Sequence, residues 1–371
     1  MNQPELLFIL TYAVILLINL AFYGYMLRLV FHKPVTPPFS KHQPVSIILC
    51  AKNEVENLRQ HLPLLLEQRH PQFEIVLIND ASSDGSGALM DEFASRNEQI
   101  QVVHVENNEA FWTSKKYALT LGIKRAKYDH LLFTDADCRP NSEQWLEAMT
   151  RPLASPDNDL VLGYGGYESR PGLLNALIRY ETLLTAAQYL GYALHGNAYM
   201  GVGRNLAYKA SLFYKHNGFV DHIKVAAGDD DLFVNQATNA SNTAVVIAPE
   251  AFTYSKPKTT WKSWILQKRR HIGVAGHYAI KHKLSLGLFF VTQWLSVFGW
   301  ILLLLCSDQP LLILGLVGVR YLVVMLVLGA MAKKLKENAL IPLIPIYEWL
   351  IICMQWFIFI KNIIHKPVRW K

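Results

Sequence analysis

Cysteine is scarce in this 371-residue chain, which carries four. They lie far apart and form no Cys-x-x-Cys pair, at Cys50, Cys138, Cys306 and Cys353. Disulfide frameworks and cysteine-based zinc sites both need paired or closely spaced cysteines. The spacing supports neither, and it predicts reduced thiols in a chain that faces the cytosol.

A long run of lysine and arginine interleaved with aromatic residues is absent from the middle of the chain, although the net charge is +7. The basic residues gather instead beside apolar segments, at 28–33, 256–283, 333–336 and 361–371. Such juxtamembrane placement suits attraction to an anionic leaflet. We therefore expect a membrane surface and phosphate-bearing substrates as partners, and no nucleic acid.

The hydrophobic residues, 51% of the chain, are concentrated at residues 6–31 and again after residue 284. The first run is long enough to cross a hydrocarbon core of about 30 Å. It is too long for a cleaved signal peptide, and it lacks a basic region before it and a cleavage site after it. We expect an uncleaved transmembrane anchor over residues 1–33. Basic residues follow this run and acidic Glu5 precedes it, which predicts that the chain enters the cytoplasm after the anchor.

Residues 284–371 predict a C-terminal transmembrane region with three apolar blocks, at 284–306, 310–331 and 340–360. The basic residues at 333–336 indicate a cytoplasmic loop between the last two blocks. Pro342 and Pro345 could break the last block into a re-entrant piece. The count of spans, three or four, stays open, and either count predicts a multi-pass protein of the cytoplasmic (inner) membrane.

Residues 45–255 are expected to form one domain, and its first part, up to residue 137, alternates between strand and helix patterns. Strands are expected at 45–50, 74–78, 101–105 and 130–133, and helices at 54–68, 83–95 and 114–126. This alternation predicts an α/β domain with a mostly parallel sheet covered on both faces. Ligands bind such sheets beyond the carboxyl ends of the strands, where the strand order reverses. Residues 173–194 predict an amphipathic helix, either in the core or on the membrane surface.

Carboxylates stand at the ends of the predicted strands. Asp80 closes the second strand, and Asp135-Ala-Asp137 follows the fourth. A cation that also holds a diphosphate needs one or two protein carboxylates. Ser82, Asp84 and Gly85, in contrast, are typical of a helix cap or an Asx turn.

Three adjacent acids, Asp229, Asp230 and Asp231, form another cluster. Their mutual repulsion raises at least one pKa unless a cation or ligand compensates. A carboxylate of this kind suits a general base that acts on a hydroxyl. The same acids would also stabilise the start of a helix.

Residues 256–283 predict a basic amphipathic helix at the membrane interface. Gln267 and Arg270 are three residues apart, on one helix face, where they could hold phosphate oxygens. A second glycine-bearing stretch, from Gly201 to Asn205, lacks the third glycine of a dinucleotide fingerprint. We interpret it as a close backbone approach at the acceptor side of a cleft.

These motifs together resemble glycosyltransferase family 2, whose members are inverting enzymes with the GT-A fold. The resemblance covers residues 45 to about 275. It rests on Ser46–Glu54, Asn79–Ser86, Ser114–Leu119, Phe133–Cys138, Gly228–Asp230 and Gln267–His271 in that order. It implies a Rossmann-like GT-A domain between the N-terminal anchor and the C-terminal transmembrane helices.

The resemblance also implies roles. Asp230 would be the catalytic base, although Asp229 or Asp231 could take its place. Asp137 would bind the metal, Mg²⁺ or Mn²⁺. The residues expected to bind the nucleotide-sugar donor are Ala51, Asn53, Glu54, Asp80, Lys115 or Lys116, Asp135, Gln267, Arg269 and Arg270. Those expected on the acceptor side are Gly203, Arg204, Asn205 and His271.

The implied function is transfer of a sugar from a nucleotide-diphosphate donor, with UDP expected from the resemblance, to a membrane lipid. Two alternatives remain: a processive polysaccharide synthase, and an inactive membrane assembly subunit. His271 stands where processive members carry a tryptophan, which argues against the synthase. The acids and Arg270 argue against the inactive subunit.

Overall fold

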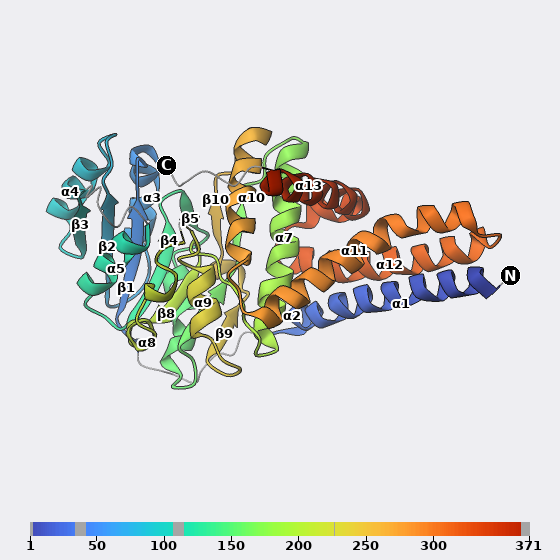
Figure 1. Ribbon diagram of the computed structural model, residues 1–371. Helices are drawn as coiled ribbons and strands as arrows, with labels where there is room; N and C mark the ends of the chain where they lie inside the picture. The colour runs from blue at the N-terminus through green and yellow to red at the C-terminus, as the bar shows by residue number, and fades with distance from the viewer. Residues whose placement is uncertain (1–2, 34–41, 107–114, 226, 365–371) are drawn as a thin grey trace.

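The computed structural model describes residues 3–33, 42–106, 115–225 and 227–364. Most of the segment between the anchor and residue 45, and the end of the basic tail, lie outside these ranges. The described chain forms a globular α/β domain from which long helices project to one side (Figure 1).

The first half of the domain alternates strands and helices as predicted. In chain order these are β1 (Val45–Ala51), α3 (Val55–Leu66), β2 (Phe73–Asp80), α4 (Ser86–Arg96), β3 (Ile100–Val105), α5 (Lys115–Arg125) and β4 (His130–Asp135). The four strands are parallel in the order β3-β2-β1-β4. The strand order thus reverses between β1 and β4, where Cys50 pairs with Asp135.

The second half extends this sheet and adds a small one. Its strands are β5 (Cys138–Pro140), β6 (Leu160–Gly163), β7 (Gly165–Tyr167), β8 (Leu206–Lys209), β9 (Thr243–Val246) and β10 (Thr253–Ser255). Its helices are α6 (Trp145–Thr150), α7 (Leu173–Leu194), α8 (Ala210–Lys215) and α9 (Asp231–Ala237), with short 3-10 helices η1 (Arg151–Ala154), η2 (Val220–His222) and η3 (Pro249–Ala251). The large sheet continues from β4 through β8, β6 and β9, with β8 antiparallel to both neighbours. The small sheet has the order β5-β10-β7.

Both faces of the large sheet are buried, which explains why its strands are nearly continuous apolar runs. Alternate residues of β1 point to opposite faces. Ile48 joins the apolar core that contains α5 and α7, while Ile47 and Leu49 join the core that contains α3 and α6. Helix α7 is therefore a core helix, which decides between the two interpretations of residues 173–194.

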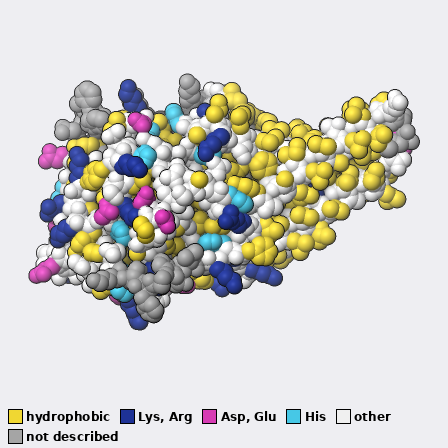
Figure 2. Space-filling view, turned by 90° about the horizontal axis from the view of Figure 1, so that it is seen from below, with side chains coloured by type: hydrophobic (Ala, Val, Ile, Leu, Met, Phe, Trp, Pro, Cys, Tyr) yellow, Lys and Arg dark blue, Asp and Glu magenta, His cyan; other side chains and the backbone are white. Residues whose placement is uncertain are grey.

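Four helices in the described ranges have the length and composition of membrane spans. The bounds are α1 (Gln3–Met26) continued by α2 (Arg28–Phe31), α11 (Ile280–Cys306), α12 (Pro310–Lys334), and η4 (Asn338–Leu343) continued by α13 (Ile344–Ile364). Helices α1, α11 and α12 lie side by side and project from the domain (Figure 1). Apolar side chains cover this projection, whereas charged side chains gather on the globular domain (Figure 2).

Helix α13 takes a different course. Near its start it packs on α12 and α7, and near its end Arg269 Nε donates a hydrogen bond to Asn362 Oδ1 at 2.7 Å. Arg269 belongs to α10 (Trp261–Ala275), so the end of α13 lies against α10, beside the α/β domain. The 3-10 helix η4 contains Pro342, at the predicted break.

Residues 256–283, expected as one basic helix, are divided. Helix α10 begins at Trp261 after the cap Thr260, whose hydroxyl accepts from Ser263 N at 3.2 Å. It ends at Ala275, and α11 begins at Ile280. Trp264 is fully buried, so α10 is packed into the protein and does not lie only on a membrane surface.

Candidate active site

A cavity of about 790 Å³ opens at the carboxyl ends of β1 and β4, where the strand order reverses. It is lined by most of the residues predicted for the site: Asn53, Glu54, Asp80, Lys115, Asp135, Asp137, Gly203, Arg204, Asp229, Asp230, Asp231, Gln267, Arg270 and His271. Ala51, Lys116, Asn205 and Arg269 are not among its lining residues.

Two loops at the strand ends are cross-linked by hydrogen bonds. Asn53, in the left-handed region at φ 56°, accepts from Ser83 N at 2.8 Å through Oδ1. Asp84 accepts from Val55 N at 3.1 Å and from Ser86 N at 3.0 Å. Asp84 therefore caps helices and fixes the loops, as predicted for it. Ala51 is buried in the core, so any part it has in binding is through its backbone.

Lys115 and Lys116, which the sequence did not separate, have different environments. Lys115 Nζ lies 2.8 Å from Asp135 Oδ1 and 3.3 Å from Asp229 Oδ2. Enclosure opposes its charge, but the two carboxylates raise the pKa of Lys115 well above its ordinary value. The Lys115 ammonium in turn holds the pKa of Asp135 below its ordinary value despite the burial of that carboxyl. Lys115 thus links the end of β4 to the acidic cluster.

Lys116 is a buried structural residue. Its ammonium donates to the carbonyls of His222, Val225 and Ala227 at 2.8, 2.8 and 2.9 Å. Burial lowers the pKa of Lys116 to about 8. Of the two lysines expected at the donor, Lys115 lines the cavity and Lys116 does not; the Lys116 ammonium instead holds the loop that leads to Asp229.

Asp135, Asp137 and Cys138 place their ligand atoms within 4.8 Å of one another. Burial and the charge of Asp135 raise the pKa of Asp137. Burial also raises the pKa of Cys138, whose thiol contacts Ser255 Oγ at 2.9 Å. A neutral thiol is a poor ligand for a hard cation, whereas the two carboxylates suit Mg²⁺ or Mn²⁺. The residues fit a divalent cation held by Asp137 with help from Asp135.

Asp230 caps helix α9 and faces a glycine backbone. Its Oδ1 accepts from Asp231 N at 2.8 Å, and its Oδ2 accepts from Gly203 N at 2.6 Å. A side chain at Gly203 would meet Asp230 Oδ2 at 3.3 Å. Burial and the neighbouring charge of Asp229 raise the pKa of Asp230 to about 6. A carboxylate of this pKa accepts a proton near neutral pH.

Asp231 differs from both neighbours. Its Oδ2 accepts from the Tyr278 hydroxyl at 2.9 Å, and burial and Asp230 raise its pKa. Each of the three adjacent acids therefore has its own partner: Lys115 for Asp229, backbone amides for Asp230, and a phenol for Asp231.

Arg204 and Asn205, adjacent in sequence, point to different places. The Arg204 guanidinium stacks over the Tyr167 ring, 4.4 Å from its centroid, and lines the cavity. Asn205 is fully buried: it accepts from Trp145 Nε1 at 3.0 Å and donates to the carbonyls of Tyr164 and Ala251, both at 2.8 Å. The expectation that Asn205 faces the acceptor is wrong, because its amide is used to join three segments of the core.

Helix α10 has one face toward the cavity and another toward α13. Gln267, which donates to the Tyr167 hydroxyl at 3.3 Å, lines the cavity together with Arg270 and His271. Arg269 instead contacts Asn362 of α13. Arg269 does not line the cavity, because successive helix residues point in different directions.

Several cavity residues were missed in the sequence. Tyr167, Glu181, Tyr189 and Lys258 all line the cavity. Glu181 lies on α7 and forms an ion pair with Lys268 of α10. No local motif marks these positions: Tyr167 is on β7, Glu181 and Tyr189 are on α7 and Lys258 precedes α10, so only tertiary packing brings them to one cavity.

The cavity also extends between apolar helices. Its far walls come from Leu286, Phe289 and Phe290 of α11 and from Ile351, Met354 and Ile358 of α13. Both helices are candidate membrane spans. A single cavity thus joins the charged residues at the strand ends to an apolar region between these helices.

The sheet is mostly parallel, and acids stand where its strand order reverses. Together with the four apolar helices, these features define a GT-A domain attached to membrane-type helices. Residues 46–216 match the family described as glycosyl transferase family 2. Over this segment the chain is similar to that family of transferases.

Curated relatives agree. A probable glycosyltransferase of Bacillus subtilis, YdaM, is 26% identical over 274 residues, which cover 70% of this chain and 64% of that protein. A poly-beta-1,6-N-acetyl-D-glucosamine synthase of Staphylococcus epidermidis is 37% identical over 101 residues, 26% of this chain and 23% of that protein. The chain thus spans less than two thirds of either relative.

A solved structure shares the fold. It is the mannosyltransferase PcManGT from Pyrobaculum calidifontis in complex with GDP-Man and Mn²⁺. Its TM-score is 0.56 at 16% identity, over 91% of this chain and 99% of that one.

Proposed function

We propose that this protein transfers one sugar from a nucleoside-diphosphate donor, of the UDP-sugar type, to a hydroxyl of a membrane lipid, with inversion. One observation carries the proposal: a single cavity contains both the acids at the strand ends and apolar walls from α11 and α13. A soluble acceptor would not need the apolar walls from α11 and α13.

On the donor side, Asn53 and Asp80 line the part of the cavity nearest the ends of β1 and β2, where a nucleoside would lie. Lys115 neutralises Asp135 and Asp229, which lowers the repulsion that a diphosphate would meet. Gln267 and Arg270 supply an amide and a guanidinium for phosphate oxygens. A divalent cation bound by Asp137 would neutralise the diphosphate as its negative charge develops.

On the acceptor side, Asp230 takes the proton of the attacking hydroxyl. The new bond from that oxygen to the anomeric carbon forms as the bond from the carbon to the phosphate oxygen breaks. The nucleoside diphosphate leaves with the electron pair from the opposite face, so the configuration inverts. Gly203 N–H, 2.6 Å from Asp230 Oδ2, orients the carboxylate for this step.

A second candidate is a processive synthase of a polysaccharide. It is favoured by the match to the synthase of Staphylococcus epidermidis over 101 residues. It requires a path for a polymer, which the apolar walls from Leu286 to Phe290 do not supply. This chain also carries His271 at the position where processive members carry a tryptophan.

The test is a transfer screen on the purified full chain in detergent, with nucleotide-sugars, total membrane lipid and Mn²⁺, read by mass spectrometry. We expect a lipid that gains one sugar mass, with no product after treatment with EDTA and recovery on adding Mn²⁺ or Mg²⁺. A long polymer would instead establish the synthase. Turnover unchanged by EDTA would contradict the metal role.

We also propose that the catalytic domain and the end of α13 face the cytoplasm. Exposed Cys306 ends α11 at the far tip of the projection, whereas Asn362 contacts α10 beside the domain. A variant with Cys306 as its sole cysteine should react with an impermeant maleimide in intact cells. A sole cysteine at Lys361→Cys should react only after permeabilisation, and labelling of both from outside would contradict this arrangement.

A further inference from the structure

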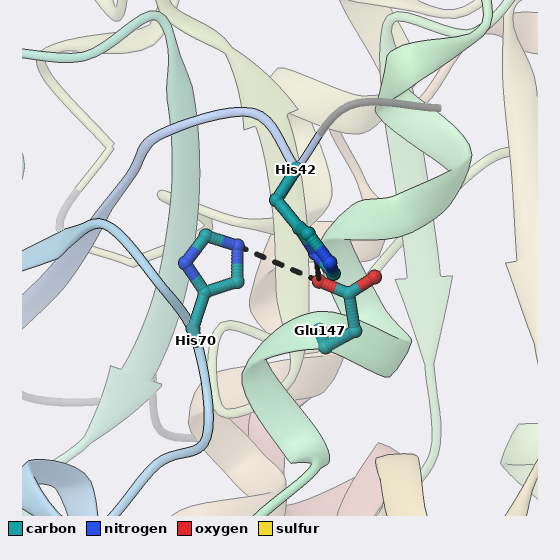
Figure 3. Close-up of side chains that lie close together, drawn as sticks. All are labelled: His42, His70 and Glu147. Atoms are coloured by element: carbon teal, nitrogen blue, oxygen red, sulfur yellow. Dashed lines mark hydrogen bonds and ion pairs between the residues drawn. The ribbon is translucent and has the colours of Figure 1, made fainter. Parts of the chain in front are cut away.

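A cluster of two histidines and a glutamate lies apart from the cavity. His42 Nδ1 is 2.9 Å from Glu147 Oε2, and His70 Nε2 is 3.5 Å from the same oxygen (Figure 3). The three potential ligand atoms all lie within 4.8 Å of one another. Two imidazoles thus converge on one carboxylate oxygen from separate parts of the chain.

The cluster is at the opposite edge of the sheet from the candidate active site. His42 precedes β1, and His70 precedes β2, whose first residue, Phe73, pairs with Val45. The site acids follow the carboxyl ends of these strands. The seven residues of β1 separate the two edges by roughly 20 Å at about 3.3 Å per residue. A cation at this cluster would therefore be distinct from one held by Asp137.

Two of the three side chains are held in place by their surroundings. The His70 side chain is 1% exposed, and its ring packs edge-on against Phe73. The loop before it is fixed to the start of α6, because Arg69 N donates to Glu143 O at 2.8 Å and Leu146 N donates to Gln68 Oε1 at 3.0 Å. Glu147 lies on that helix. His42, by contrast, is 55% exposed in its side chain.

We propose that His42, His70 and Glu147 bind a zinc ion, with water as the fourth ligand. Two imidazole nitrogens and one carboxylate oxygen form a ligand set that zinc takes in three-ligand sites. Imidazole also disfavours Mg²⁺ and Ca²⁺, which prefer oxygen ligands. The ion would take the place of the ring protons that now point at Glu147 Oε2.

Binding changes one hydrogen bond. Gln72 N donates to His70 Nδ1 at 3.3 Å, so Nδ1 acts here as an acceptor and the ring proton lies on Nε2. A ring that binds zinc through Nε2 carries its proton on Nδ1. Zinc binding therefore moves that proton and gives up a long, weak hydrogen bond in return for a metal bond.

The consequence is a further tie within the domain. His42 lies just before β1 and Glu147 lies on α6. Zinc would therefore join the start of β1 to α6. It is expected to stabilise the full protein without entering the chemistry of the cavity.

The test uses the full chain in detergent, carrying Asp137→Asn to remove the catalytic cation site, stripped with EDTA and titrated with Co²⁺ and then Zn²⁺. We expect one Co²⁺ per chain with the visible spectrum of a tetrahedral site, displaced by Zn²⁺. His42→Ala and Glu147→Gln should each weaken binding at least about tenfold, since even the partners behind metal ligands are worth 10–100-fold. Because His42 is exposed, its variant should fold normally.

The matched control is His104→Ala. His104 is also half exposed, at 46%, and its Nε2 lies 2.9 Å from Asp91 Oδ1, but among the described residues no third potential ligand joins that pair. This variant should bind Co²⁺ as the parent does. Zinc should also raise the thermal midpoint of the parent and of His104→Ala, and not that of His42→Ala. Absence of a tetrahedral Co²⁺ spectrum, or equal affinity in His42→Ala, would overturn the proposal.

Discussion

Single carboxylates in the cavity differ in how readily they ionise. Asp230 has a pKa raised to about 6, and as the proposed base it works only when deprotonated. We therefore expect kcat/KM to fall as the pH drops through about 6, because the Asp230 carboxylate becomes protonated. Asp230→Asn should lower kcat by about 10²–10⁴-fold.

The Asp230 variant has a built-in structural control. Asparagine also caps helices well, so α9 should keep its start. Its single amide oxygen can accept from Asp231 N or from Gly203 N but not from both, so the free energy of unfolding should fall by about 1–3 kcal/mol while the protein stays folded. A pH–rate profile and a melting curve on the same preparation check both points. Near-normal turnover by a folded Asp230→Asn would move the base to Asp229 or Asp231.

Lys115 and Lys116 offer a matched pair of substitutions. Lys115→Met removes the charge between Asp135 and Asp229, so we expect transfer to fall by about 10²–10³-fold, the usual effect of losing one electrostatic group at a reacting site. Lys116→Met removes the donor to three carbonyls and should destabilise the fold by about 1–3 kcal/mol for each group left without a partner. Transfer assays and melting curves should separate the two. Equal losses of activity at equal stability would contradict the assignment.

These lysines also show where sequence reasoning ends. The strand ends and their acids could be predicted, because parallel strands bring their carboxyl ends to one edge. Which of two adjacent lysines reaches that edge depends on the rotation of α5, and no local pattern states it. Arg269 shows the same limit on α10: it contacts Asn362, while its neighbours Gln267 and Arg270 line the cavity.

At the scale of elements, the position of Asn205 decides how the two sheets are joined. Its amide connects α6, the link between β6 and β7, and η3. Its neighbour Arg204 stacks on Tyr167 and lines the cavity instead. From the sequence we expected both residues on the acceptor side. The burial of the Asn205 amide among three distant segments could not be predicted, because it arises only from tertiary packing.

We expect Asn205→Ala to destabilise the domain strongly, by about 1–3 kcal/mol for each buried group left without its partner. The matched control is Asn141→Ala, an exposed residue whose amide donates once, to Pro249 O at 2.9 Å. Melting curves of the two variants should differ by many degrees. A small, equal shift in both would show that the Asn205 contacts do not hold the sheets together.

Helices α7 and α13 mark a second limit of the sequence. Their lengths and apolar character could be predicted, yet their directions could not. Both α7 and α13 are apolar, but α7 is packed in the core and α13 keeps exposed apolar residues such as Phe357 and Ile360. Whether an apolar helix is packed in the core or stays exposed depends on the elements around it. The packing of α7 in the core also brings Glu181 to the cavity.

At the scale of the whole molecule, a buried polar cluster joins the projecting helices. Arg320 of α12 and Glu348 of α13 are both 0% exposed and form a bidentate ion pair at 2.5 and 2.8 Å. Asn19 of α1 accepts from Arg320 Nε at 3.1 Å. Gln293 of α11, which also lines the cavity, donates to Glu348 Oε1 at 3.2 Å. The cluster therefore connects all four candidate spans, and through Gln293 it reaches the lining of the cavity.

Removing one partner should cost far more than removing both. Arg320→Met or Glu348→Leu alone leaves an uncompensated charge among apolar helices, and breaking a buried pair in this way costs about 3–5 kcal/mol. The double variant leaves no charge, and apolar replacements of similar volume are often neutral. We expect thermal midpoints in detergent to fall sharply in each single variant and to recover in the double variant. If the double variant is as unstable as the single ones, the loss comes from the buried polar groups of Asn19 and Gln293 that have lost their partners, and not from an unpaired charge.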